Sequence, residues 1–213
     1  MKPYFAKTPK LVQKLFSNYT WCKDFNHKEI YLTFDDGPHP EITEWVLTLL
    51  KKHNAAATFF CVGDNLLKYP TIFKEIIQQN HSIGNHTFDH LNGWNSSNKD
   101  YLNSILKAEE VIHNSKFINH KSYLFRPPYG KIKSSQAKLL IKEGYEIIMW
   151  DVLSADFDQM ISKEKCLQNV IKNTKSGSII VFHDSEKSFK NLEYVLPKVL
   201  EYFSKKGFAF KAL

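Results

Sequence analysis

The chain has 213 residues, of which 43% are hydrophobic and 24% charged, with a net charge of +7 and a pI of about 9.1. These values are typical of a soluble globular protein and exclude a disordered or fibrous one. The length suits one well-buried domain, which we expect over residues 1–213. The lysines are scattered and no basic block is interleaved with aromatic residues, so nucleic acid is not an expected partner.

The N-terminal segment carries lysines that interrupt every apolar run, which argues against a signal peptide. No stretch approaches the roughly 18 consecutive apolar residues of a transmembrane helix. Cys22, Cys61 and Cys166 are widely spaced and contain no CxxC motif, so we expect free thiols. Together these features predict a cytoplasmic protein. The basic pI leaves peripheral contact with an anionic membrane surface as an open alternative.

Short apolar runs and amphipathic stretches alternate along the chain. Residues 30–34, for example, read as a buried strand, and residues 41–53 carry an apolar stripe at helical spacing. The expected strands are 30–34, 56–62, 81–84 (a strand or a turn), 123–125, 146–150, 178–182 and 208–211. The expected helices are 41–53, 70–80, 99–114, 134–143, 163–174 and 191–206. This alternation predicts an α/β fold built of parallel strand–helix units.

Polar clusters recur just after the predicted strands, near positions 35, 86, 126, 151 and 183. In a (β/α) barrel the carboxyl ends of the strands open on one face, which holds the active site. An open doubly wound sheet would also gather ligands there. No GxGxxG motif follows the first strand, so a dinucleotide-binding sheet is the weaker choice.

Asp35 and Asp36 follow the first strand and precede a Gly-Pro turn. Two adjacent carboxylates repel each other unless each has its own partner. Since successive side chains of an extended segment point to opposite sides, one can bind a metal while the other faces a substrate.

His86 and His90 are spaced four residues apart, which on a helix or turn places both imidazoles on one face. Two histidines and one aspartate would make an open catalytic site like that of a zinc hydrolase. Imidazole and carboxylate also suit Co, Ni or Fe.

Arg126 opens the rigid sequence Arg-Pro-Pro-Tyr-Gly, and an arginine beside a catalytic carboxylate keeps that carboxylate ionised. Asp151 and Asp156 are both candidate partners for Arg126. His183, directly after the strand at 178–182, is a candidate general acid.

Taken together, these motifs resemble the polysaccharide deacetylase, or NodB-homology, family, and they occur in the family order within residues 30–185. The matching segments are Thr33–Pro38, His86–His90, Arg126–Gly130, Trp150–Asp156 and Val181–His183. The resemblance implies a distorted (β/α)7 TIM-like barrel. It also implies a carbohydrate esterase that removes N-acetyl groups from an N-acetylglucosamine-containing glycan, such as peptidoglycan or chitin, and releases acetate.

The resemblance also implies the roles of individual residues. The metal ligands would be Asp36, His86 and His90, around one divalent ion, with Zn expected. The catalytic residues would be Asp35 as general base and His183 as general acid, with Arg126 and Asp156 orienting them. The substrate-binding residues would be Tyr129 through its backbone N–H, Trp150 and Val181 around the acetyl group, and Pro127.

This sequence departs from the family pattern at two positions. Leu153 stands where an aspartate is usual, and Phe157 where a tryptophan is usual. The departures put local substrate contacts in doubt and leave the metal site intact. We also expect the polar segment 89–100, with an exposed Trp94, to contact substrate.

Three alternatives keep the same fold. One is deacylation of a lipid-linked amino sugar, which the basic pI favours, and another is O-acetyl esterase activity on xylan. The third is a catalytically inactive carbohydrate-binding relative, which the intact set of candidate ligands and catalytic residues disfavours.

Overall fold

The computed structural model describes residues 4–115 and 123–213. The strands are β1 (Glu29–Asp35), β2 (Thr58–Cys61), β3 (Ser82–Asn85), β4 (Leu124–Phe125), β5 (Glu146–Ile147), β6 (Val152–Leu153), β7 (Ile179–His183) and β8 (Ala209–Lys211). The α-helices are α1 (Lys10–Leu15), α2 (Ile42–Lys52), α3 (Gly63–Lys68), α4 (Pro70–Gln78), α5 (Asn98–Asn114), α6 (Ser134–Lys142), α7 (Lys163–Asn173) and α8 (Glu186–Lys205). Short 3₁₀ turns, η1 and η2, cover Gly93–Asn95 and Pro128–Gly130.

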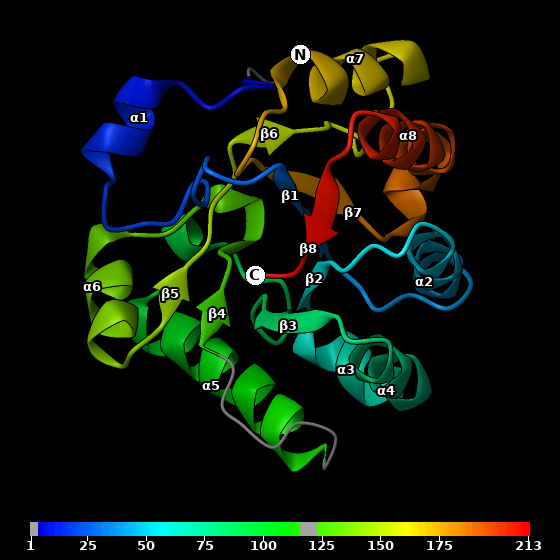
Figure 1. Ribbon diagram of the computed structural model, residues 1–213. Helices are drawn as coiled ribbons and strands as arrows, with labels where there is room; N and C mark the ends of the chain where they lie inside the picture. The colour runs from blue at the N-terminus through cyan, green and yellow to red at the C-terminus, as the bar shows by residue number, and fades with distance from the viewer. Residues whose placement is uncertain (1–3, 116–122) are drawn as a thin grey trace.

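The strands form one parallel sheet in the order β5-β4-β3-β2-β1-β7-β6, and β8 pairs with β1 outside this path. The sheet curls around a centre and the helices lie outside it (Figure 1). This is the expected distorted (β/α)7 barrel. Because the paired strands run parallel, their carboxyl ends open on the same face of the barrel.

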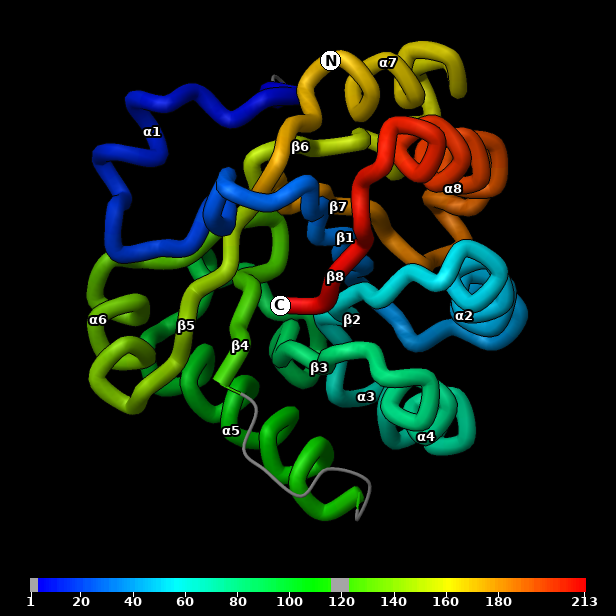
Figure 2. Tube along the Cα trace, in the orientation of Figure 1, coloured from blue at the N-terminus to red at the C-terminus, as the bar shows by residue number. Residues whose placement is uncertain are grey.

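The barrel would be open between β5 and β6, and the N-terminal segment fills that gap (Figure 2). On the β5 side, Thr20 N–H donates to Ile147 O and Met149 N–H donates to Thr20 O, at 2.9 and 2.7 Å. On the β6 side, Leu153 N–H donates to Ala6 O at 2.9 Å. Backbone groups at the two sheet edges therefore find partners in a segment that precedes β1.

Alternation along β1 separates the core from the interior of the barrel. Leu32 and Phe34 are fully buried in the larger apolar cluster, which α2 and α8 cover. Thr33 and Asp35 point to the other side, where Asp35 and Thr33 meet the Arg126 guanidinium. One face of β1 is therefore apolar and packs against the helices, while the other is polar and faces the candidate site inside the barrel.

Several predicted elements differ from the observed ones. Residues 146–150 do not form one strand, because the chain leaves the sheet after Ile147 and returns at Val152. The last helix begins at Glu186 instead of residue 191, with Phe189 of the added turn packed against the core. Helices α1 and α3 were not predicted, since each has only six residues and α1 buries none of them.

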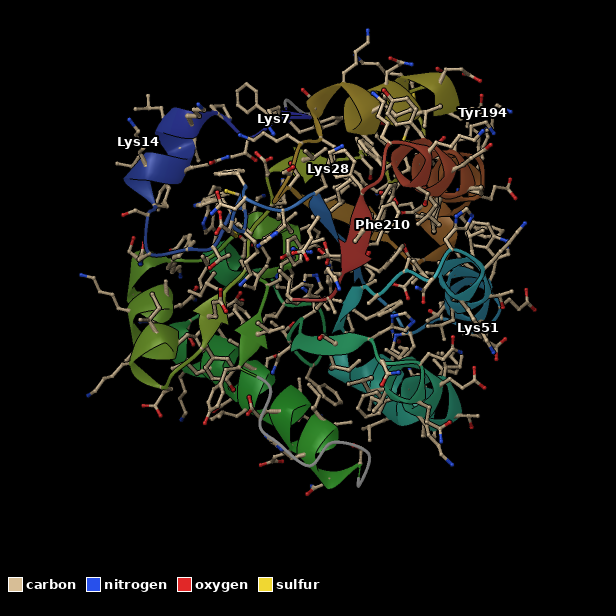
Figure 3. The ribbon with its side chains drawn as sticks, in the orientation of Figure 1. Lys7, Lys14, Lys28, Lys51, Tyr194 and Phe210 are labelled. Carbon is tan, nitrogen blue, oxygen red and sulfur yellow. The ribbon has the colours of Figure 1, made fainter. Side chains whose placement is uncertain are left out.

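Charged residues are spread over the surface, as the scattered lysines predict. Lys14 and Lys51 point outward from different sides of the molecule, whereas Phe210 of β8 is buried (Figure 3). Within the described residues, none of the helices is long and apolar enough to cross a bilayer. The three cysteines are free, as expected, with Cys61 and Cys166 buried.

Candidate active site

Two adjacent aspartates lie where β1 ends, and each has its own partners. Asp35 pairs in register with His183 of β7 and is only 4% exposed. Asp36 has a φ of 81°, in the left-handed region, which turns the chain out of the strand. Asp35 faces Arg126, whereas Asp36 faces His86 and His90. The expectation that the two carboxylates serve different partners is met.

Asp36, His86 and His90 form a cluster in which the ligand atoms all lie within 4.8 Å of one another. The Nε2 atoms of His86 and His90 lie 3.7 and 3.1 Å from Asp36 Oδ1. Two imidazole nitrogens and one carboxylate oxygen are a donor set typical of a catalytic zinc site with positions left for water and substrate. These are the three residues expected to hold a metal.

The protonation of the cluster also suits a cation. His86 Nδ1 lies 2.7 Å from the carbonyl oxygen of Arg126, which can only accept, so Nε2 presents its lone pair to the cluster. Burial lowers the pKa of His86 to about 4, which keeps it neutral. Burial also raises the pKa of Asp36, but the hydrogen bond from His90 and the charge of His183 hold that pKa well below its usual value. Metal ligands must be deprotonated, and Asp36 and His86 meet that condition.

The two histidines lie on a loop after β3 and not on the helical segment that their spacing allowed. Thr87 and His90 have φ values of 64° and 55°, so the loop turns twice through the left-handed region. Thr87 N–H donates to Asn85 Oδ1, and Leu91 N–H donates to Thr87 Oγ1, both at 2.9 Å. The rings nevertheless meet, with centroids 5.1 Å apart.

Left-handed backbone conformations concentrate around the site. Five of the eight non-glycine residues with positive φ in the described part of the chain lie in its loops: Asp36, Thr87, His90, Tyr129 and Ala155. Each such conformation costs about 1–3 kcal/mol and persists only where surrounding contacts impose it. The site is therefore held in place by its loops' buried contacts.

Arg126 is fully buried and pairs with Asp35. Its Nη1 atom donates to Asp35 Oδ1 at 2.7 Å and to Thr33 Oγ1 at 2.6 Å. Nε donates to Ile148 O at 3.1 Å and Nη2 to Met149 O at 2.9 Å. The guanidinium carbon also lies 4.1 Å from the centroid of the Phe60 ring. These contacts leave the guanidinium one orientation.

Neither Asp151 nor Asp156 pairs with Arg126, which corrects the two candidates taken from the sequence. Asp151 accepts from Lys7 and, at 2.7 Å, from Ser178. Asp156 accepts from His183. The sequence could not distinguish these aspartates, because both follow the strand predicted at 146–150, whereas in the structure Asp151 precedes β6 and lies beside Ser178 at the start of β7.

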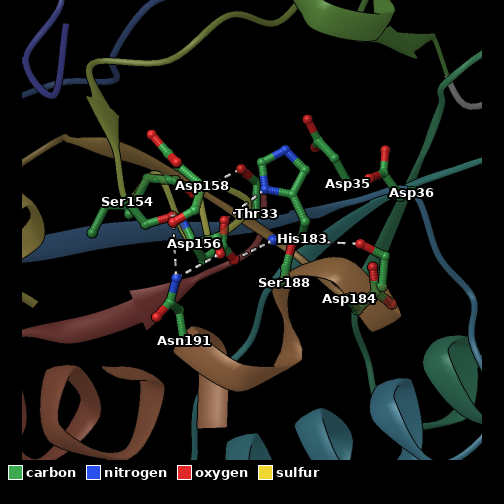
Figure 4. Close-up of polar contacts among 12 residues, drawn as sticks. Thr33, Asp35, Asp36, Ser154, Asp156, Asp158, His183, Asp184, Ser188 and Asn191 are labelled. Atoms are coloured by element: carbon green, nitrogen blue, oxygen red, sulfur yellow. Dashed lines mark hydrogen bonds and ion pairs between the residues drawn. The ribbon is translucent and has the colours of Figure 1, made fainter. Parts of the chain in front are cut away.

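His183 is held by Asp156 from two directions. Its Nδ1 and its backbone N–H each lie 2.8 Å from a different oxygen of that carboxylate. Figure 4 shows the imidazole between Asp156 and the Asp35–Asp36 pair. Burial lowers the pKa of His183, but the Asp156 charge and hydrogen bond outweigh burial and raise it to about 9. The imidazole therefore keeps its proton at neutral pH.

The residues expected to contact substrate lie around this centre. Tyr129 is 61% exposed, has a φ of 61°, and its ring centroid lies 4.6 Å from that of His90. The centroid of the Trp150 ring lies 6.0 Å from the guanidinium carbon of Arg126. Val181 is buried and shares a face of β7 with His183, two residues later. Pro127 is buried, and its carbonyl accepts from Gly130 N–H at 2.9 Å.

Asp184 is a site residue that the sequence did not single out. It is fully buried behind the Asp35–Asp36 turn and accepts from Gly37 N–H at 3.1 Å and from Thr43 Oγ1–H at 2.5 Å. A Cβ atom on Gly37 would lie 2.1 Å from Asp184 Oδ2, so only glycine fits there. Burial raises the pKa of Asp184 to about 8. The only feature of the sequence that could have indicated Asp184 is its position directly after His183, at the end of an apolar strand.

Comparison with known proteins agrees with this geometry. A family model described as polysaccharide deacetylase matches residues 23–148, more than half of the chain. The chain belongs to the polysaccharide deacetylase family. The resemblance noted from the motifs is thereby confirmed, together with the hydrolase class that the family represents.

Family members named after their substrates are similar over most of their length. A peptidoglycan-N-acetylglucosamine deacetylase of Bacillus cereus is 35% identical, over 90% of this chain and 89% of its own. Another from the same organism is 35% identical over 85% of this chain, which spans 66% of it. A chitooligosaccharide deacetylase of Azorhizobium caulinodans is 36% identical over 75% of each protein.

Solved structures of the family share the fold. The Bc1960 peptidoglycan N-acetylglucosamine deacetylase, in complex with 4-naphthalen-1-yl-N-oxidanyl-benzamide, has a TM-score of 0.87 and 34% identity, covering 97% of this chain and 95% of its own. A mutant of a CE4 family pseudoenzyme with restored enzymatic activity has a TM-score of 0.80 and 25% identity, covering 91% of this chain and 68% of its own. The fold thus carries both active and inactive relatives.

The two departures from the family pattern lie beside β7, Leu153 in register with Val181 and Phe157 against His183. Leu153 is buried on β6, and its position offers no carboxylate to the site. The Phe157 ring lies 5.2 Å from the His183 ring, edge to face. An aromatic side chain therefore still packs against His183, although it brings no indole N–H.

Proposed function

We propose that this protein hydrolyses N-acetyl groups on an N-acetylglucosamine-containing glycan, of the peptidoglycan or chitin type, and releases acetate. One observation carries the proposal. A three-residue cation site of Asp36, His86 and His90 lies beside a carboxylate held by Arg126 and an imidazole held by Asp156. A base and an acid thus flank the place where a polarised carbonyl would lie.

The chemistry of the cluster fits one divalent cation, and we propose Zn²⁺, with Co²⁺, Ni²⁺ or Fe²⁺ as substitutes. Asp36, His86 and His90 would hold it. When bound, such an ion supplies Lewis acidity that polarises the amide carbonyl and acidifies a water molecule. The chain's own residues perform the remaining steps.

Asp35 is the proposed general base. The buried Arg126 guanidinium fixes the direction of the Asp35 carboxylate through the 2.7 Å hydrogen bond. Asp35 takes a proton from the attacking water as the C–O bond forms. The backbone N–H of Tyr129 is the proposed donor to the carbonyl oxygen, which becomes negatively charged as the carbon becomes tetrahedral.

His183 is the proposed general acid. Asp156 holds Nδ1, so the proton on Nε2 is the one available to the leaving amine. Transfer of that proton lets the C–N bond break and gives acetate and a free amino sugar. The residues proposed to line the pocket for the acetyl group are Trp150, Val181 and Pro127.

The glycan class rests on the names of the relatives. Two relatives of Bacillus cereus are called peptidoglycan-N-acetylglucosamine deacetylases, and one of Azorhizobium caulinodans is called a chitooligosaccharide deacetylase. The Xyl-CE4 domain of a multidomain xylanase shares the fold with a TM-score of 0.79 and 27% identity. Xylan esters therefore belong in any test of specificity, and so does a lipid-linked amino sugar.

The test is acetate release from chitopentaose, acetylated peptidoglycan and acetylated xylan. The protein is first stripped with a chelator and then given Zn²⁺ or Co²⁺. We expect release from an amino-sugar polymer that disappears on stripping and returns with metal. Release from xylan alone would contradict the N-deacetylase proposal, and release unaffected by stripping would contradict the metal dependence.

The cytoplasmic location and the absence of a nucleic-acid partner are separate proposals. Cell fractionation with an antibody against this chain tests the first, and recovery in the wall or medium would contradict it. A gel-shift assay with single-stranded and duplex DNA tests the second, and a shift at physiological salt would contradict it.

A further inference from the structure

Trp94 is an exposed aromatic side chain with a fixed orientation. It is 58% exposed, yet its indole Nε1–H donates to Ile132 O at 3.2 Å and its backbone N–H to Asn92 Oδ1 at 3.0 Å. A large apolar ring that faces solvent gains nothing from burial. A ring held by its own polar edge presents a flat apolar surface to whatever approaches.

The loop beneath Trp94 is built to hold that ring. The carbonyl of the buried Gly93 accepts from Gln136 Nε2 at 3.0 Å, and Ser96 O accepts from Lys133 Nζ at 2.6 Å. A Cβ atom at Gly93 would lie 2.6 Å from Lys131 O, so the loop approaches the segment after Tyr129 as closely as a glycine allows. Trp94 is therefore fixed against that segment.

Lys131 places a positive charge beside the ring. Its Nζ lies 5.2 Å from the centroid of the Trp94 ring. Among the residues described, no carboxylate forms an ion pair with this ammonium. Only one residue separates Lys131 from Tyr129, so their Cα atoms lie within about 7 Å of each other. Since Tyr129 contacts the His90 ring, the Trp94–Lys131 pair borders the candidate active site.

We propose that Trp94 and Lys131 form a sugar-binding subsite that selects a carboxylate-bearing unit of the glycan. The apolar face of a pyranose would lie on the indole, and the carboxylate would pair with the Lys131 ammonium. This inference rests on the proposed function and deepens it, because it selects an acidic amino-sugar polymer over a neutral one. Muramic acid without a stem peptide carries such a carboxylate on its lactyl ether. An attached stem peptide converts that carboxyl to an amide and brings carboxylates of its own.

The experiment compares two tetrasaccharides of equal length. One is chitotetraose, and the other is the peptide-free repeat of N-acetylglucosamine and N-acetylmuramic acid. KM and kcat are measured by acetate release with Zn²⁺ present, and Kd by calorimetry. A third substrate with the stem peptides retained distinguishes the lactyl carboxylate from the peptide carboxylates.

Trp94→Ala should raise KM and Kd for both tetrasaccharides about tenfold with kcat within about twofold, and Trp94→Tyr should restore most of the affinity. Lys131→Gln should raise KM about fivefold for the muramic acid substrate and leave chitotetraose unchanged. Added salt should weaken only the wild-type preference for the acidic substrate. An effect of Lys131→Gln confined to the peptide-bearing substrate would overturn the lactyl assignment.

The chain offers a matched control at the opposite face of the barrel, where the strands begin. Phe25 is 52% exposed with Lys175 Nζ 4.5 Å from its ring centroid, and both residues precede strands instead of following them. Phe25→Ala and Lys175→Gln should leave every KM unchanged. Equal changes in KM at the Trp94–Lys131 and Phe25–Lys175 pairs would overturn the proposed subsite. Wild-type KM and Kd values for Trp94→Ala would overturn it as well. If the wild type releases no acetate from any glycan, the proposed function fails, and the calorimetric Kd values still decide the subsite.

Discussion

At the scale of single residues, the site depends on side chains whose orientation is set by one buried neighbour. Arg126 holds Asp35, Asp156 holds His183, and the Arg126 carbonyl orients His86. In each pair, one residue is proposed to contact substrate or metal, and the other holds that residue in place. Changing either member should therefore alter the reaction in a distinguishable way.

Asp35→Asn should lower kcat by about 10²–10⁴-fold, because the amide cannot accept a proton from water. The bound metal should remain, since Asp35 is not in the cation cluster. His86→Ala should lose both metal and turnover. Metal content after dialysis and acetate release check the two variants together. Turnover by Asp35→Asn near the wild-type rate would remove the base assignment.

The pH profile should report His183. Its pKa is raised to about 9 by Asp156, so the protonated acid is present at neutral pH and is lost as the pH rises through that value. We expect kcat/KM to fall on the alkaline side near pH 9. In Asp156→Asn the raising charge is gone, so the fall should move to lower pH. An alkaline limb that does not move would show that another group produces it.

At the scale of elements, the turn after β1 is tied to both α2 and β7. Asp184 N–H donates to Asp35 O at 3.1 Å, while the Asp184 carboxylate accepts from Gly37 and from Thr43 of α2. His39 N–H in turn donates to Thr43 Oγ1 at 2.7 Å. Asp36, a candidate metal ligand, is therefore positioned by a network that spans three elements.

Thr43→Val should lower the free energy of unfolding by about 1–3 kcal/mol, because it removes one of the two donors to the buried Asp184 carboxylate and the acceptor of the His39 N–H. Thr48→Val is the matched control on the same helix, since its hydroxyl is exposed and donates to Glu44 O within the helix. That change should cost less than about 0.5 kcal/mol. Urea unfolding followed by circular dichroism measures both, and equal costs would contradict the network.

The sequence predicts elements well where burial is continuous. The runs at β1 and β7 are apolar over several residues, so each was located to within about one residue of the observed strand at either end. The two-residue strands β5 and β6 carry no such run, and their edges are completed by the N-terminal segment. Pairing between segments that are far apart in the sequence cannot be predicted from the residue pattern of either segment alone.

The same limit applies within the site. The spacing of His86 and His90 indicated a metal site, and the match to the family motifs selected Asp36 as the third candidate ligand. The left-handed turns at Asp36 and His90 were not predicted, since neither is a glycine. The partner of Arg126 and the role of Asp184 depend on which strands are neighbours, which is a property of the sheet order.

At the scale of the whole molecule, the cation site joins distant parts of the barrel. Asp36 follows β1 and the two histidines follow β3, which are separated in the sheet by β2. A ligand that binds only the folded state stabilises it by mass action. The metal should therefore stabilise the fold as well as the reaction.

Removing the metal should lower the melting temperature by roughly 5–10 °C, if Zn²⁺ is supplied at about 100 times its Kd. His90→Ala should abolish the difference between chelated and Zn²⁺-loaded protein, whereas His53→Ala, at the end of α2, should preserve it. Thermal unfolding with and without Zn²⁺ measures the shift. A shift that persists in His90→Ala would place the stabilising ion elsewhere.

The Arg126–Asp35 pair has a consequence for how such a protein can evolve. Loss of Asp35 alone would leave a fully buried guanidinium without its carboxylate, which costs about 3–5 kcal/mol. That is a large fraction of the roughly 5–15 kcal/mol that holds an ordinary domain folded. A descendant that abandons catalysis by this route must therefore also change Arg126 or add stability elsewhere. Selection for folding alone would then preserve the base long after selection for activity had ended.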